Sequence, residues 1–169
     1  MKNQEINAWD TLSVHGSRVS KITTENDCAT FVLDNGMWLL KEHPQNTFGD
    51  AVATVGEAKL TFKGIKNPMI TVVKRRHVAG PLYLHWPRSC KWEEFVGKIN
   101  SGEWTLEFDA EDRPVERGVV YDGFIWLKGN DKYSWDVRFS FKFAETVYEW
   151  NDIDGSRTFS DPENEVVAE

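Results

Sequence analysis

The chain has few of the residues that enzymes and metalloproteins use. It contains two cysteines and four histidines in 169 residues. Cys28 and Cys90 lack the Cys-x-x-Cys spacing of zinc and redox sites. The histidines form no His-Glu-x-x-His motif, and no serine stands in a Gly-x-Ser-x-Gly sequence. We therefore expect no catalytic residue, no metal site and no cofactor.

Long hydrophobic runs are also missing. No segment approaches the roughly 20 apolar residues of a membrane span. Residues 1–7 lack the apolar stretch of a signal peptide. These features predict a cytoplasmic protein with free thiols that does not enter a membrane.

Positive charge is scarce, since 20 Lys and Arg face 27 Asp and Glu, for a net charge of −7. An acidic chain repels phosphate backbones, which argues against nucleic acid and favours a basic protein as partner. The one basic cluster is Lys74, Arg75 and Arg76, at the end of a predicted strand. It is a candidate anion-binding patch or a solubilising hairpin end.

The strongest positive signal is the alternation of apolar and polar residues over 133–143. A period of two predicts a half-buried strand. Weaker runs of the same kind predict strands at residues 18–23, 28–33, 37–40, 58–63, 69–74, 81–86, 104–108, 119–127 and 146–150.

Turn residues separate these runs. Asn35-Gly36 between two apolar runs predicts a hairpin that joins residues 28–33 to residues 37–40. Asp122-Gly123 interrupts the run 119–127 and indicates a strand that is either broken or bulged there.

One segment has helical spacing, because Trp92, Phe95, Val96 and Ile99 follow the i, i+3, i+4, i+7 pattern. We expect a short helix at about 90–100, with Ser89 as N-cap and Gly102 after its end. Many short strands with one helix predict a mainly β fold, either an antiparallel β-sandwich or a partly closed barrel.

The length predicts a single β-rich domain over residues 1–157. Residues 158–169 are polar and acidic, which predicts a mobile C-terminal tail. If the long strand lay at a sheet edge, it could pair with its copy in a homodimer.

Eight tryptophans are more than a chain of this size needs for its core. Trp92 and Trp135 share faces with other apolar residues and are expected inside. Trp38, Trp126 and Trp150 are the candidate contacts with a partner or ligand. Their rings would suit a protein interface or a sugar-stacking platform.

Three segments carry a resemblance to a known group. Val14-His15-Gly16-Ser17-Arg18-Val19, the turn Asp34-Asn35-Gly36, and the strand with its following turn at residues 58–65 are the segments concerned. Over about the first seventy residues they resemble small bacterial β-rich proteins, many of them uncharacterised and some of them immunity proteins of polymorphic toxin systems. The resemblance implies toxin neutralisation and assigns a role to no single residue.

We therefore expect a non-enzymatic, protein-binding domain, with an immunity-type protein as the specific case. A carbohydrate-binding module that uses exposed tryptophans is the first alternative. An unrecognised enzyme is the second, with Glu107 and Asp109 as the paired carboxylates to consider, although their side of the strand looks like a solvated face.

Overall fold

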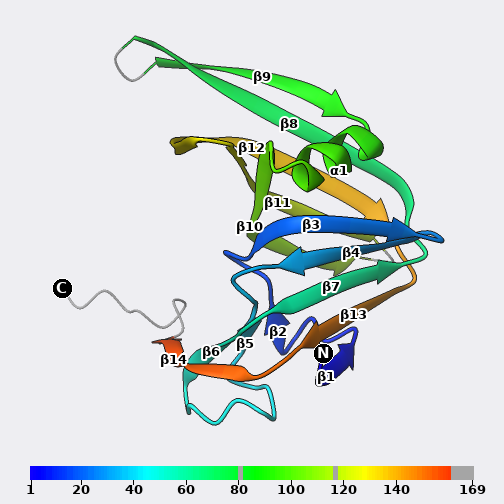
Figure 1. The fold of residues 1–169 in the computed structure, drawn as a ribbon, viewed down its shortest axis with the longest axis vertical. Coiled ribbons are helices and arrows are strands. Elements are labelled where there is room, and N and C mark those ends of the chain that lie inside the picture. Colours follow the sequence, from blue (N-terminus) through cyan, green and yellow to red (C-terminus); the bar gives the residue numbers. More distant parts are fainter. Residues whose placement is uncertain (80–81, 116–117, 161–169) are drawn as a thin grey trace.

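The computed structural model describes residues 1–79, 82–115 and 118–160. Within these ranges it describes all side chains except those of residues 75–77, 79, 82–83, 110–115, 119, 131–133 and 155–160. Within the described ranges, the chain forms fourteen strands and one helix (Figure 1).

Ten strands form one large sheet. In spatial order they are β1 (Asn3–Ile6), β13 (Glu145–Trp150), β7 (Ala58–Lys63), β4 (Cys28–Leu33), β3 (Arg18–Glu25), β10 (Trp104–Val115), β11 (Gly118–Leu127), β12 (Asn130–Lys142), β8 (Lys66–Ala79) and β9 (Leu82–Cys90). A small sheet holds β14 (Ile153–Ser160), β6 (Ala51–Val55), β5 (Trp38–Leu39) and β2 (Leu12–Ser13). The strands pair antiparallel, which confirms the predicted fold class.

The large sheet curls around an aromatic core. Phe31 on β4 stacks on Phe139 of β12 with ring centroids 6.1 Å apart, although three strands separate β4 from β12 in the sheet. Phe62 on β7 meets Phe141 of β12 edge to face at 4.7 Å. The two ends of the sheet, β1 and β9, stay apart, so the curl does not close into a barrel.

The helix α1 (Trp92–Asn100) lies on the inner side of this curl (Figure 1). It buries Phe95 and Ile99, and the Phe95 ring lies 6.1 Å from that of Phe139. Asn100 fixes its end, because the side-chain amide both donates to and accepts from the backbone of Ile22 at 2.8 Å. The predicted helix is thereby confirmed.

The predicted N-cap of the helix is wrong. Ser89 belongs to β9, where it pairs with Thr71, and Lys91 occupies the N-cap position without a side-chain hydrogen bond. Gly102 follows the helix with φ +69°, as a residue after a helix end often does.

The long alternating run is confirmed as β12. Val137, Phe139 and Phe141 are buried, whereas Arg138 and Lys142 are exposed. However, β12 lies between β11 and β8 in the strand order, so it does not have the edge position that the homodimer prediction assumed. The homodimer itself stays a prediction.

The predicted hairpin at Asn35-Gly36 is wrong. β4 pairs with β3 and β7 in the large sheet, while β5 pairs with β2 and β6 in the small one. The chain changes sheets at Gly36, where φ is +77°. The hairpin lies instead between β3 and β4, at Asn26 and Asp27, whose positive φ values of 46° and 59° suit a type I′ turn.

The predicted bulge is present, but on the neighbouring strand. The register of β10 against β11 shifts between Phe108 and Ala110, so Asp109 is the additional residue opposite Asp122-Gly123. At the C-terminal end, residues 158–160 of the predicted tail belong to β14 and pair with β6. Residues 161–169 lie outside the described residues.

None of the helices in the described part of the chain is long and apolar enough to cross a bilayer.

A substitution at Gly36 tests the close approach at the point where the chain passes from the large sheet to the small one. A Cβ atom there would lie 1.9 Å from the carbonyl oxygen of Val55. Gly36→Ala should therefore lower the free energy of unfolding by about 3 kcal/mol, from the left-handed backbone and the overlap together. Urea denaturation measures this. Gly49→Ala is the matched control, because φ is +67° there with open space around it, and it should cost only about 1 kcal/mol. Equal losses in the two variants would contradict the close approach at Gly36.

Candidate interaction surface

The C-terminal part of strand β8 extends beyond the body of the protein. Lys66 to Val73 pair with β12, whereas from Lys74 onward β8 pairs with β9 alone. Residues 74–79 and 82–86 therefore form a two-stranded arm that projects beyond the sheet (Figure 1). A two-stranded ribbon has no core of its own and rarely stands alone in water.

Large apolar side chains are exposed on this hairpin. Four of the seven that the described residues expose belong to β8 and β9, namely Met69 (68%), Val78 (50%), Leu84 (44%) and Trp86 (48%). By alternation Leu84 and Trp86 share one face of the hairpin and Met69 lies on the other. Neighbouring exposed apolar side chains are typical of interaction sites, whereas single scattered ones are ordinary.

One face of the arm continues the inner side of the sheet. Lys74 stands directly opposite Trp86 in the β8–β9 ladder, and Leu84 follows on the same face by alternation. The Lys74 ammonium lies 4.8 Å from the ring centroid of Trp135 on β12. We call Lys74, Leu84, Trp86 and Trp135 the arm surface.

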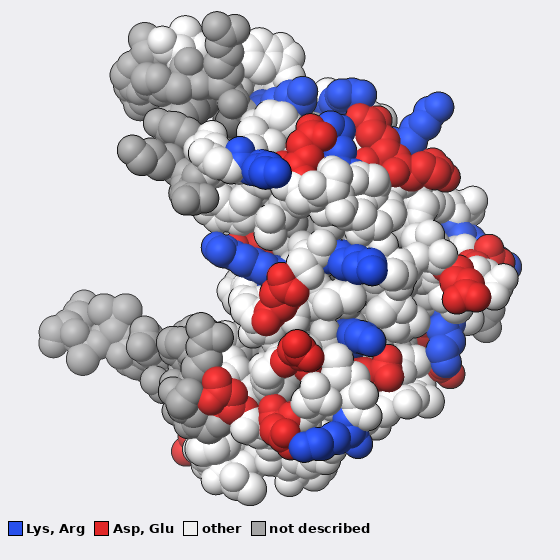
Figure 2. All heavy atoms as spheres, viewed as in Figure 1, with Lys and Arg blue, Asp and Glu red and all other residues white. Residues whose placement is uncertain are grey.

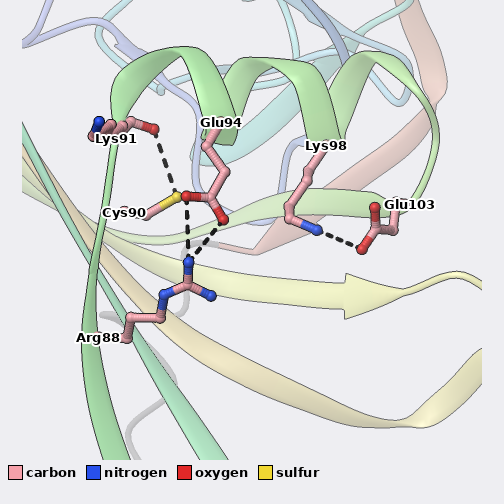
Figure 3. Close-up of polar contacts among 6 residues, drawn as sticks. All are labelled: Arg88, Cys90, Lys91, Glu94, Lys98 and Glu103. Carbon is pink, nitrogen blue, oxygen red and sulfur yellow. Dashed lines mark hydrogen bonds and ion pairs between the residues drawn. The ribbon is translucent and has the colours of Figure 1, made fainter.

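Contacts at the base of the arm hold it against the helix (Figure 3). Nη2 of Arg88 lies 3.2 Å from Oε1 of Glu94 on α1. Further along α1, Lys98 pairs with Glu103 at 2.6 Å, and its ammonium lies 5.0 Å from the ring centroid of Trp104. Trp104 in turn meets Trp135 edge to face at 6.1 Å. The arm surface is therefore continuous with the aromatic core.

Charge divides unevenly between the β8–β9 hairpin and the rest of the chain. Residues 66–90 contain five Lys and Arg and no Asp or Glu, so all other residues carry −12 to give the net charge of −7. Figure 2 shows that Lys and Arg side chains meet Asp and Glu where the arm joins the body. The exposed apolar residues thus lie in the basic part of an acidic protein.

The predicted tryptophan contacts are not brought together on one surface. Trp38 is half-buried and donates its indole N–H to the carbonyl of His15 at 2.7 Å. Trp126 is half-buried, donates to Glu107 at 3.0 Å, and lies under Arg18 with the guanidinium 5.6 Å from its ring.

Trp150 has no exposed surface. It is packed in the core, so its prediction as a contact is corrected. Its ring meets that of His43 edge to face at 5.7 Å, beneath the loop that carries this histidine.

The predicted anion patch is described only in part. Lys74 belongs to the arm surface, whereas the side chains of Arg75 and Arg76 lie outside the described ones. The patch stays a prediction.

Two histidines and Glu107 make hydrogen bonds within the fold. Nδ1 of the His15 ring hydrogen-bonds to the carbonyl of Asp109, and buried His43 accepts from the backbone N–H of Gln45 at 3.1 Å. Glu107 accepts from Arg18 at 2.7 Å. Among the described side chains, no group of three or more His, Cys, Asp and Glu could hold a metal ion.

Sequence reasoning missed Leu84 and Trp86 as exposed residues. Trp135 is half-buried and packs against the core, in line with its expected place inside. The alternation of Leu84 and Trp86 resembles that of strands whose apolar face is covered. No local signal marks Lys74 as the place where β8 loses its pairing with β12.

Comparisons with protein-family models, curated proteins and solved structures gave no match. The functional argument therefore depends on the geometry of the arm surface.

The reactivity of Cys90 tests the packing at the base of the arm. It is 9% exposed, and burial, followed by the carboxylate of Glu94, raises the pKa of its thiol. A raised pKa means less thiolate, so iodoacetamide should modify Cys90 more slowly than half-buried Cys28 at about pH 8, as peptide mass spectrometry would show. Glu94→Gln should accelerate the reaction of Cys90. Equal rates at the two cysteines would contradict this packing.

Pro87 lies in β9, the strand at one end of the large sheet. It lacks a backbone N–H, so the edge cannot offer an unbroken row of donors to another strand. Pro87→Ala should increase self-association in analytical ultracentrifugation, and Ser89→Ala on the same strand should not. If Pro87→Ala stays as monodisperse as the parent protein, the proline has no protective role.

Proposed function

We propose that this protein is a non-enzymatic binding domain and that the arm surface is its interface with another protein. The observation that carries the proposal is the exposure of Trp86 and Leu84, 48% and 44%, on a ribbon that leaves the sheet. Water contact with these side chains is unfavourable, and a partner that covers the arm would remove it.

The arm surface has the composition of an interface centre. Tryptophan is among the residues that most often dominate binding energy, and neighbouring groups keep water away from it. Lys74 and Trp135 hold each other in place, so part of the surface is fixed before a partner arrives. Pre-ordered side chains lower the entropic cost of association.

Binding through the face of the arm is favoured over pairing along its edge. Pro87 interrupts the donors at the free edge of β9, whereas Trp86 and Leu84 project from the ladder. The partner should therefore lie across the arm and not extend the sheet.

The charge of the β8–β9 hairpin that carries the arm favours an acidic partner. The net charge of the whole chain predicts a basic one, but the exposed apolar residues lie in the segment that holds five basic and no acidic residues. A surface with carboxylates around an apolar centre would complement it and would be steered to it at low salt. The −12 on the other residues repels phosphate backbones, which favours a protein over a nucleic acid.

The immunity-type role implied by the resemblance is one case of this function. In that case the partner is a toxin, and covering of the toxin by the arm surface would be the means of neutralisation.

Affinity capture from the native host lysate tests the proposal when the immobilised protein is compared with matched variants. The parent chain and Phe48→Ala should retain the same stoichiometric acidic protein, because Phe48 is an exposed aromatic outside the arm. Trp86→Ala should bind it at least about 30-fold more weakly, since a hot-spot tryptophan contributes about 2 kcal/mol or more. The dissociation constants are measured by biolayer interferometry with the recaptured partner.

Three results would overturn the proposal. They are a partner that binds both variants equally, capture of nucleic acid that nuclease treatment removes, and an empty column at low salt. Unchanged unfolding curves for Trp86→Ala would show that its effect is on binding alone.

A further inference from the structure

We propose that a groove on the outer face of the large sheet is a second site, which binds a neutral carbohydrate. The groove has a volume of about 580 Å³, within the usual range of ligand sites. It is lined by residues of four neighbouring strands: Thr71, Val73, Asp109, Asp122, Gly123, Phe124, Asp136, Val137 and Arg138. The side chains that enter it point away from the aromatic core, and the site is independent of the arm surface.

A clamped guanidinium forms one part of the groove. Arg138 grips Asp122 with both ends of its planar group, at 2.7 Å from Nε and 2.6 Å from Nη2. Thr71 stands beside Arg138 in the register of β8 and β12. Such a fork fixes the direction of the remaining N–H groups and carboxylate lone pairs.

An aromatic ring forms the next part. Phe124 pairs with Asp136 across β11 and β12, and Val73 pairs with Asp136 on its other side. Phe124 is half-buried on the outer face and lies outside the core cluster. It gives the groove an apolar floor next to a carboxylate.

The bulge shapes the end of the groove. Asp109 is the additional residue of β10, and the strand approaches β11 so closely that a Cβ on Gly123 would lie 2.4 Å from the carbonyl of Glu107. The loop before β3 fixes this geometry, because the His15 ring hydrogen-bonds to Asp109 and the Gly16 N–H donates to Phe108 at 2.7 Å. Bulges of this kind redirect side chains beside functional sites.

The mixture of groups selects the class of ligand. Three carboxylates accept hydrogen bonds, while Arg138 and Thr71 donate them. An anion would be repelled by the aspartates, and a simple cation would leave the donors and the ring unused. Sugar hydroxyls both donate and accept, and the C–H face of a pyranose packs on an aromatic ring. The inference assigns carbohydrate binding to Phe124 and its neighbours and not to Trp38, Trp126 or Trp150.

Isothermal titration calorimetry with maltotetraose, cellotetraose, xylotetraose and chitotetraose tests the site. At least one of these should bind. Phe124→Ala and Asp136→Asn should each weaken that binding at least about fivefold, through the lost ring contact and the lost charge-assisted hydrogen bond. Trp86→Ala on the arm is the control and should bind as the parent does.

The inference is overturned if none of the four binds at about 10 mM, well above the range of even weak complexes. It is also overturned if binding survives both groove variants, or if putrescine binds to the groove in place of the sugars. Matching circular dichroism spectra and unfolding midpoints verify that the variants are folded.

Discussion

The packing of β4 and β7 against β12 is the contact on which the whole structure depends. Phe31 on Phe139 and Phe62 on Phe141 join strands that are distant in the order of the sheet. Aromatic side chains bury the largest apolar areas and add specific ring geometry. These contacts bend a ten-stranded sheet into a curl, and the interior of the curl is occupied by side chains.

The arm is a direct consequence of this curl. Ile70 and Val72 on β8 are buried under the inner layer, whereas Lys74, two residues further along the same face, is beyond the last pairing with β12. Within a few residues, β8 thus passes from a buried strand of the sheet to an exposed strand of the arm. Arg88 near the base of the arm pairs with Glu94 of α1.

Much of the fold follows from periodicity in the sequence. The strict alternation over 133–143 predicts β12, and the spacing of Trp92, Phe95 and Ile99 predicts α1, because each pattern extends over enough residues to define one buried face. Asn35-Gly36 fails as a hairpin signal since a turn signal is local and does not identify the sheet that receives the next strand.

The candidate site is less predictable for a related reason. Alternation shows that Trp150 and Trp86 lie on apolar faces, yet only the three-dimensional arrangement shows that one face is covered and the other is not. The groove residues Asp109, Phe124 and Asp136 come from three strands, and their proximity depends on a bulge and on strand register. No single segment of the sequence encodes the bulge or the register.

The central claim is that the arm surface contacts a partner protein in the cell. Site-specific photo-crosslinking tests this most directly, with benzoyl-phenylalanine placed at position 86 and, for comparison, at position 48. The account predicts one discrete crosslinked product from position 86 and none from position 48. No product from position 86, or the same products from both positions, would contradict it.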